Sequence, residues 1–258
     1  MDLDQLRQDG FTVAEQAVTP ALLDAVLAAV REVEGFVLDD PATWAGKHAM
    51  VPIWGHQALW DVRQHPPVHA AFAAACGTEE LWVSMDRVSI KAPGDPGLRI
   101  HWDVDPASDG PRLLQGVVAL TDTPAGAGGF CCVPELFRDR AGWLARHPDA
   151  AAWDIDLEGH DPTPVPAQAG DLIVFDARLP HGNEANGAAT PRLAQYVTMR
   201  EPDAWGGSAE GRVELYEAGR SVFGDYEGIV EPWPPATLTP LGRRLLGLDA
   251  WPSAARRP

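Results

Sequence analysis

Short segments of alternating, β-branched character, separated by turns rich in proline and glycine, are the feature that most restricts how this chain can fold. The first, LWVSMDRVSIKA, runs from Leu81 to Ala92 and is followed by the breaker PGDPG. A period of two places successive side chains on opposite faces of a strand. Short strands at this spacing predict a closed or double-sheet β architecture of the jelly-roll type. The further candidate strands are Leu98–Trp102, Leu114–Thr121, Gly129–Val133, Asp171–Phe175 and Leu193–Met199.

Outside this β region, the pattern favours helices and loops. Residues 4–35 read as two helices split by a turn at Val18-Thr19-Pro20. The aromatic-rich stretch 37–69 has no period and is expected to be mostly loop. Ala204–Gly228 is also expected to be a loop, either over the site or on an ordinary surface. Further helices are expected at Pro67–Cys76, Pro134–Pro148 and Leu238–Leu246.

The length and apolar content fit one large core. The chain has 258 residues, of which 45% are apolar. We therefore expect a single domain over residues 1–258, mainly β with flanking helices. Its expected parts are a mainly helical segment at 1–80, the double-stranded β-helix core, cupin-like, at 81–200, and a loop with a C-terminal helix at 201–258.

Charge and patterning exclude several classes of partner. With 20 basic and 37 acidic residues, the net charge of −17 would repel a phosphate backbone, so nucleic acid is not expected. The first residues, MDLDQLRQDGF, lack the basic and apolar regions of a signal peptide, and no stretch approaches the ~18 apolar residues that span a bilayer. Three cysteines, two of them adjacent, form neither a disulfide framework nor a zinc spacing. We expect a cytoplasmic protein with no membrane partner.

A His-x-Asp motif supplies the first candidate metal ligands. On a strand, residues i and i+2 point to the same face, so His101 and Asp103 can bind one ion. The motif is not specific by itself, because His147-Pro148-Asp149 matches it too. Context separates them: His101 ends a predicted strand, whereas His147 lies at the end of a polar helix. We interpret the second match as chance.

A histidine and an arginine farther along the chain complete the constellation. His181 follows the apolar strand DLIVFDARLP, and Arg192 comes eleven positions later at the start of another strand. Two histidines and one carboxylate leave three octahedral positions open, which suits Fe(II) that must bind a 2-oxo acid and then dioxygen. An arginine one strand away can pair with the far carboxylate of that acid.

These residues lie in blocks that resemble the phytanoyl-CoA dioxygenase family of Fe(II)/2-oxoglutarate oxygenases. The blocks are DGFTV, IHWDVDP, GVVALTDTPAGAGGF with CVPELF, and GDLIVFDARLPHGNEANGAATPRLAQY. The resemblance covers most of the chain, and the last block is the most specific. It implies a double-stranded β-helix with N-terminal helices.

The resemblance also implies roles for individual residues. His101, Asp103 and His181 would bind Fe(II), and Arg192 would bind the carboxylate of 2-oxoglutarate. Gln115 would be a further cofactor contact, because it begins a strand that lines the cofactor pocket in similar proteins. The chain departs from some relatives at 117–118, where two valines replace an aromatic residue. Because Asp103 is present, a halogenase, which needs that position vacated, is disfavoured.

The function expected on these grounds is oxidation, most simply hydroxylation, of an unactivated C–H bond in a small molecule, with 2-oxoglutarate and O2 consumed and succinate and CO2 released. Two alternatives remain open. One is a metal-dependent jelly-roll enzyme of another type, such as an isomerase or a dioxygenase without a 2-oxo acid. The other is a non-catalytic binding scaffold. The substrate and the oligomeric state cannot be read from the sequence, although a small secondary metabolite is preferred.

Other residues near the predicted site have competing interpretations. Arg87 and Lys91 share one face of the first strand and could meet an anionic substrate or lie on a solvated edge. Ten tryptophans could shape an apolar substrate pocket, but aromatic residues are mostly core, and Trp82 and Trp102 are expected to serve packing.

Overall fold

A six-stranded antiparallel sheet is the largest element of the fold, which is a computed structural model describing residues 1–149, 151–204, 208–220 and 234–252. We call it the major sheet. Its strand order, β1-β9-β6-β11-β4-β2, brings together segments far apart in the chain. The strands are β1 (Phe11–Ala14), β2 (His48–Val51), β4 (Val88–Lys91), β6 (Leu114–Ala119), β9 (Leu172–Asp176) and β11 (Arg192–Val197).

A smaller, four-stranded sheet faces the major sheet, and we call it the minor sheet. Its order is β5-β10-β7-β8, made of β5 (Leu98–His101), β10 (His181–Asn183), β7 (Phe130–Cys132) and β8 (Thr163–Pro164). A third pair joins β3 (Trp82–Val83) to β12 (Met199–Arg200). The predicted fold class, mainly β with flanking helices and a jelly-roll core, is confirmed.

Alternation along each strand divides the major sheet into two apolar faces. On β6, Leu114 and Val118 belong to the core under the helices, whereas Val117 and Ala119 belong to the core between the sheets. The inner core also contains Phe130 from the minor sheet. The period of two in the sequence therefore encodes both layers at once.

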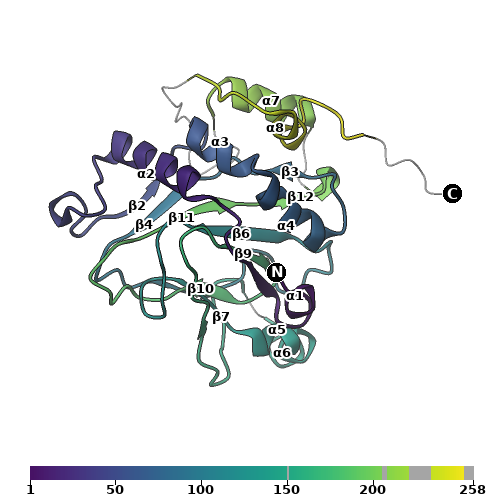
Figure 1. Cartoon of the computed structure of the whole chain (residues 1–258). Helices are drawn as coiled ribbons and strands as arrows, with labels where there is room; N and C mark the ends of the chain where they lie inside the picture. The colour runs from purple at the N-terminus through teal and green to yellow at the C-terminus, as the bar shows by residue number, and fades with distance from the viewer. Residues whose placement is uncertain (150, 205–207, 221–233, 253–258) are drawn as a thin grey trace.

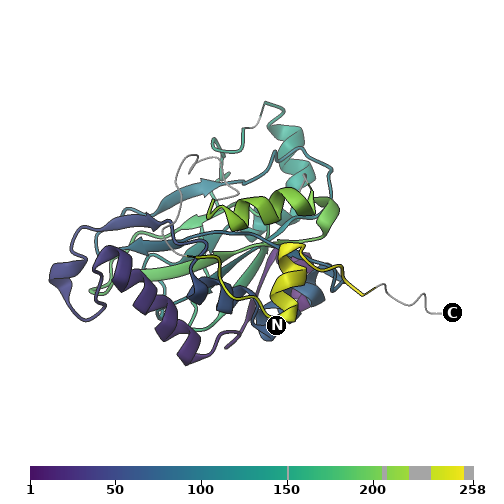
Figure 2. The ribbon, with the colours of Figure 1, turned by 90° about the horizontal axis from the view of Figure 1, so that it is seen from above.

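Helices cover the outer face of the major sheet (Figure 1). Seen from above, the purple α2, the green α7 and the yellow α8 lie across the sheet (Figure 2). Their apolar side chains join the large core of that face, which includes the fully buried Trp54 and Trp60. The helices on this side of the molecule and at the N-terminus are α1 (Leu3–Asp9), α2 (Pro20–Glu34), α3 (Gln57–Arg63), α4 (Pro66–Cys76), α7 (Ala209–Glu217) and α8 (Pro240–Leu246), with short 3-10 turns at Pro41–Thr43 and Pro202–Ala204.

The predicted helical insertion between β7 and β8 is present as α5 (Pro134–Arg138) and α6 (Arg140–Arg146). It lies on the side of the minor sheet, away from α2, α7 and α8 (Figure 1). A separate cluster, Trp102, Val133, Leu136 and Trp143, is buried there. Trp102 therefore packs as predicted, at the junction of strand and insertion.

Three parts of the sequence interpretation are wrong. Phe11–Ala14, expected within a helical stretch, is an edge strand paired with β9, because Gly10 at φ +83° ends α1 and frees Phe11 to enter the inner core. The expected loop 37–69 contains β2, which pairs with β4 at the edge of the major sheet, and α3, which is buried in the core under the helices.

The third error concerns the expected loop 204–228. Its residues 209–217 form the helix α7. The buried side chains of α7 are Arg212 and Tyr216, and the helix has no continuous apolar face, so its sequence shows no helical period. Residues 205–207 and 221–228 of that loop lie outside the described residues. Among the described helices, none combines the length and hydropathy needed to cross a bilayer.

Candidate metal centre

The pairing of β5 with β10 brings His101 and His181 together. The two strands are antiparallel and place these residues directly opposite each other in register. Their rings lie with centroids 4.6 Å apart, and both side chains are buried. One cross-strand pair therefore brings together two histidines that are eighty positions apart in the sequence.

Asp103 completes the group two residues beyond the end of β5. Its Oδ1 lies 3.3 Å from His101 Nε2 and its Oδ2 lies 3.4 Å from His181 Nε2. One ligating atom from each of the three residues lies within 4.8 Å of the others, and this is the only such group among the described residues. The side chain of Asp103 is 33% exposed, so the group opens toward solvent on the carboxylate side.

Backbone carbonyls orient both imidazoles. His101 Nδ1 lies 3.0 Å from the carbonyl oxygen of Arg99, and His181 Nδ1 lies 2.8 Å from that of Leu179. A carbonyl only accepts, so each Nδ1 carries a proton and each Nε2 faces the carboxylate of Asp103. With Nδ1–H fixed in this way, Nε2 is the nitrogen that would bind a metal ion, which would take the place of the Nε2 proton.

The carboxyl group of Asp103 is kept ionised. Burial alone would raise its pKa, but hydrogen bonds from His101 and His181 outweigh burial and hold the pKa well below its usual range. The charged form of the carboxylate is the one that binds a cation. The chemistry and spacing of the three donors therefore fit a divalent metal such as Fe(II).

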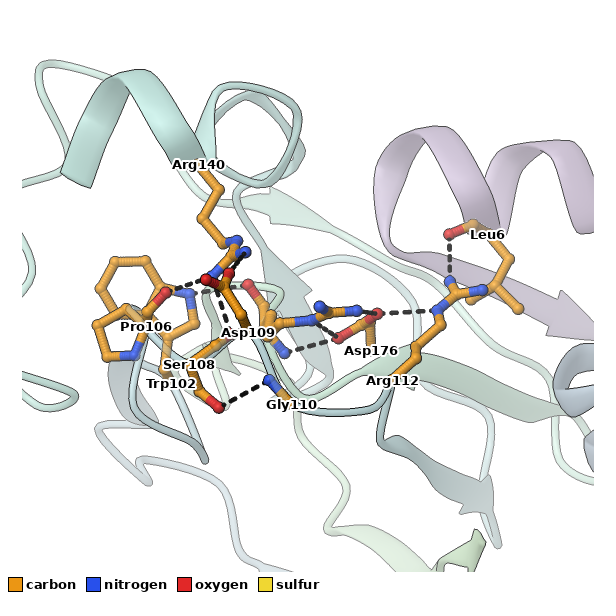
Figure 3. Close-up of polar contacts among 10 residues, drawn as sticks. Leu6, Trp102, Pro106, Ser108, Asp109, Gly110, Arg112, Arg140 and Asp176 are labelled. Atoms are coloured by element: carbon orange, nitrogen blue, oxygen red, sulfur yellow. Dashed lines mark hydrogen bonds and ion pairs between the residues drawn. The ribbon is translucent and has the colours of Figure 1, made fainter. Parts of the chain in front are cut away.

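The segment that follows Asp103 is tied down by arginines (Figure 3). Arg140 of α6 donates to the carbonyl oxygens of Pro106 and Ser108 and lies 3.6 Å from the carboxylate of Asp109. These contacts hold the first part of the link between Asp103 and β6 against the insertion. The loop that carries Asp103 is therefore held to α6 a few residues after Asp103.

The same link ends at a second ionic cluster. The carboxylate of Asp176, fully buried at the end of β9, accepts hydrogen bonds from Arg112 at 2.8 Å and from Arg178 at 3.0 Å. Arg112 also donates to the carbonyl oxygen of Leu6, which connects the cluster to α1 (Figure 3). The cluster therefore fixes the chain where it enters β6 and where it leaves β9.

Arg192 lies at the start of β11 with its side chain only 3% exposed. It shares a face with Ala194, which belongs to the core between the sheets. The guanidinium has a distant contact to the hydroxyl of Ser89, at 3.5 Å, and no ion pair with a carboxylate among the described residues. A buried cation without an anion is costly, so this position fits an anionic ligand between the sheets.

Gln115 lies on the inner face of β6, in register with Phe175 of β9. Its Oε1 is buried without a hydrogen-bond partner among the described residues. Phe175 in turn packs on His181 with ring centroids 4.6 Å apart. The amide therefore lies on the same face of the major sheet as Arg192, at the other end of the β6–β11 pair, with polar capacity left unused.

Aromatic residues that the sequence did not single out surround the two histidines. Phe130 and Phe175 pack on His181, at centroid distances of 5.7 and 4.6 Å. Trp153 stacks on His101, with centroids 4.0 Å apart and planes inclined by 9°. The two phenylalanines lie in predicted strands, but no pattern marks Trp153, which comes from the insertion.

The other sequence candidates make contacts of their own. His147, in the second His-x-Asp match, has Nε2 3.0 Å from Glu158 Oε1 and stacks on Trp143. Lys91 Nζ lies 3.2 Å from Asp95 Oδ1. Arg87 is adjacent to Asp86, with Nε 3.8 Å from the carboxylate.

Comparison with known proteins gives one family and several relatives. The family model described as phytanoyl-CoA dioxygenase matches residues 6–194. Among curated proteins, "Ava biosynthesis cluster protein O" of Aspergillus versicolor is 24% identical over 234 residues, covering 76% of each chain.

Solved structures share the fold. The epimerase SnoN, in complex with Fe3+, alpha ketoglutarate and nogalamycin RO, superposes with a TM-score of 0.61 at 20% identity, over 92% of this chain and 94% of that one. EvdMO1 superposes with a TM-score of 0.56 at 21% identity, over 78% of this chain, which spans about half (49%) of the length of EvdMO1. At these identities the likeness concerns the fold alone.

Proposed function

The chain belongs to the phytanoyl-CoA dioxygenase family of Fe(II)- and 2-oxoglutarate-dependent oxygenases, and we propose that its own reaction is hydroxylation of an unactivated C–H bond in a small molecule. Members of this family use Fe(II), 2-oxoglutarate and O2. Bound together, these supply the C–H oxidation, with succinate and CO2 as the other products.

His101, Asp103 and His181 are the proposed iron ligands. The observation that carries the proposal is the convergence of two imidazole Nε2 atoms on both oxygens of one ionised carboxylate. Three ligands on one side of a metal would leave the other side open for 2-oxoglutarate and O2. The carbonyls of Arg99 and Leu179 hold the imidazoles in the binding tautomer without needing further side chains.

Arg192 is the proposed anchor for the far carboxylate of 2-oxoglutarate. Its burial, its face on β11 and its lack of an ion pair among the described residues support this role. A bidentate pair with a carboxylate would supply the missing negative charge. Gln115 is the proposed second contact, since an amide can present its NH2 or its oxygen to the co-substrate.

The chain's apolar groups would keep water from the centre. Phe130 and Phe175 pack on the ring of His181, in the core between the sheets. Exclusion of water protects reactive species from side reactions and strengthens the pairing of Arg192 with an anion. The proposed contribution of the protein is thus to bind the metal, to orient 2-oxoglutarate and to shield the centre from water.

The experiment that tests this function is anaerobic titration of the Fe(II)-loaded protein with 2-oxoglutarate, followed by the weak visible charge-transfer band. We expect the band in wild type and a rise of about 100-fold in the concentration needed for Arg192→Ala, since loss of a charged hydrogen-bonded pair costs about 3 kcal/mol. Arg192→Lys should be intermediate, because an ammonium cannot pair in the same bidentate way.

Arg212→Ala is the matched control. Arg212 is buried to a similar degree, but donates to backbone carbonyls of Val83 and Leu246 on the helix side of the major sheet. Its loss should lower stability and leave the 2-oxoglutarate titration of the folded protein unchanged. Absence of the band in wild type would contradict the proposal and favour an isomerase, a dioxygenase without a 2-oxo acid, or a scaffold.

Product analysis then separates hydroxylation from related outcomes on the same centre. A gain of one oxygen atom supports hydroxylation. Loss of two hydrogens would indicate desaturation or ring closure, and an unchanged mass with altered chirality would indicate epimerisation, the reaction named for the structural relative SnoN.

A further inference from the structure

An exposed tryptophan lies against one of the proposed iron ligands. Trp153 is 45% exposed, the most exposed tryptophan among the described residues, and its ring lies parallel to that of His101. The imidazole beneath is only 4% exposed. An aromatic surface of this size is costly to leave in water and gains when another ring covers it.

The position of Trp153 is fixed by the insertion. The backbone N–H of Trp102 donates to the carbonyl of Ala152 at 2.8 Å, and the indole of Trp143 donates to the carbonyl of Asp156 at 2.8 Å. Asp154 N–H closes a turn onto the carbonyl of Ala151, which presents Trp153 at the bend. Hydrogen bonds on both sides of Trp153 in the chain therefore fix the position of this residue, although its side chain belongs to none of the buried clusters.

A cation lies over the exposed ring. The guanidinium carbon of Arg99 is 5.6 Å from the centroid of Trp153. Arg99 is exposed, and no ion pair with a carboxylate is formed by it within the described residues. In a chain with a net charge of −17, an uncompensated arginine next to the metal ligands is positioned to attract an anionic group.

We propose that Trp153 and Arg99 form a substrate subsite that binds a flat ring carrying an acidic group and holds it beside the metal centre. The proposal rests on the function proposed above and narrows its substrate class. The ring would stack on Trp153, and the acidic group would pair with Arg99.

The test uses two carboxylates that differ only in the flatness of the ring. Protein loaded with Ni(II) and 2-oxoglutarate, which cannot turn over, is titrated calorimetrically with benzoate and with cyclohexanecarboxylate. We expect wild type to prefer the flat probe, and Trp153→Ala to reduce that preference by roughly 2- to 10-fold, the range of aromatic pair energies. Trp153→Phe should retain part of the preference.

Trp251→Ala is the matched control. Trp251 also stacks on a histidine, His69, with centroids 5.2 Å apart and planes inclined by 17°, but His69 is not part of the ligand group. Its removal should leave the preference unchanged. Arg99→Gln should weaken both probes by a similar factor, because both carry a carboxylate.

Several results would overturn the subsite: no preference for the flat probe in wild type, an unchanged preference in Trp153→Ala, or unchanged affinity for both probes in Arg99→Gln. A Trp153 that only shields His101 would alter metal affinity but not discrimination between the probes. Failure of the proposed function is recognised separately, by the absence of the Fe(II)/2-oxoglutarate band in wild type.

Discussion

The two sheets that face each other are stabilised in different ways. The major sheet has six strands, and its outer face lies under a layer of helices that shares one large core. The minor sheet has strands of two to four residues, and its own buried cluster contains four residues, two of them tryptophans. Most of the apolar burial that stabilises the fold therefore belongs to the major sheet.

The proposed metal ligands lie on the minor sheet and just beyond it. His101 ends one short strand and His181 begins another, while Asp103 is already in the link beyond. Their side chains are oriented by backbone carbonyls, by a cross-strand pair and by neighbouring aromatic rings, and none of the three belongs to the large core under the helices. The comparison suggests that stability and metal binding can be changed separately, and the following predictions test that separation.

The largest expected effect is on stability, from Trp60→Ala in α3. Trp60 is fully buried and meets Tyr216 edge-on at 5.3 Å, so its loss should lower the free energy of unfolding by about 4 kcal/mol. Chemical denaturation measures this change. The folded fraction should bind Fe(II) with wild-type affinity, and a matching loss of metal affinity would show that the two sheets are not separable.

Asp176→Asn should have the next largest effect, because Asp176 lies where the major sheet meets the link that follows Asp103. The amide would leave Arg112 and Arg178 without their buried carboxylate, at a cost of about 3 kcal/mol at neutral pH by chemical denaturation. Arg243→Ala, which removes an exposed pair with Asp249, is the control and should cost under about 1 kcal/mol.

The Asp176 effect should also depend on pH. Burial alone would raise the pKa of this carboxyl, but hydrogen bonds and charge from Arg178 and Arg112 outweigh it, and the folded-state pKa is lowered. Stabilisation from such a group is fully present above the unfolded pKa of about 3.9 and is lost as the pH falls through the lower folded value. The difference between wild type and Asp176→Asn should therefore shrink in acid, and a constant difference would contradict this origin.

Asp103→Ala should affect metal binding more than stability, which is the reverse of the effect expected for Trp60→Ala. Loss of the only carboxylate of the triad should weaken Fe(II) binding by more than about 100-fold, beyond the effect of removing an outer hydrogen-bond partner, and abolish turnover. The free energy of unfolding of the metal-free protein should fall by less than the about 4 kcal/mol expected for Trp60→Ala, because Asp103 loses its contacts with His101 and His181 but is partly exposed. Near-normal oxidation by this variant would refute the ligand assignment.

The smallest effect is expected from Arg140→Ala, which releases the link after Asp103 from α6. Fe(II) affinity should fall by about 10-fold, as for other residues that position a metal ligand without touching the metal. Arg146→Ala on the same helix is the control, since Arg146 pairs only with the exposed Asp139 and with Glu158 in the contacts described. Equal metal affinity in wild type and Arg140→Ala would show that Asp103 holds its position unaided.

Much of the β core was predictable because alternation is a local property. Each predicted strand from Leu98 onward overlaps an observed strand, and β6 carries the two faces of the core in its own sequence. The short strands β8 and β10 were missed because two or three residues are too few to show a period. The expectation of one domain over residues 1–258 stays a prediction.

The sequence by itself determined the residue types of the candidate site: a histidine and a carboxylate two positions apart, a second histidine after an apolar strand, and an arginine eleven positions later. Only the tertiary structure decided that His101 and His181 pair across two strands, that Arg192 is buried without a carboxylate partner among the described residues, and that Trp153 stacks on His101. The physical reason is range. Strand period and ligand chemistry are written in neighbouring residues, whereas cross-strand register, burial and the return of an insertion depend on the packing of segments distant in sequence.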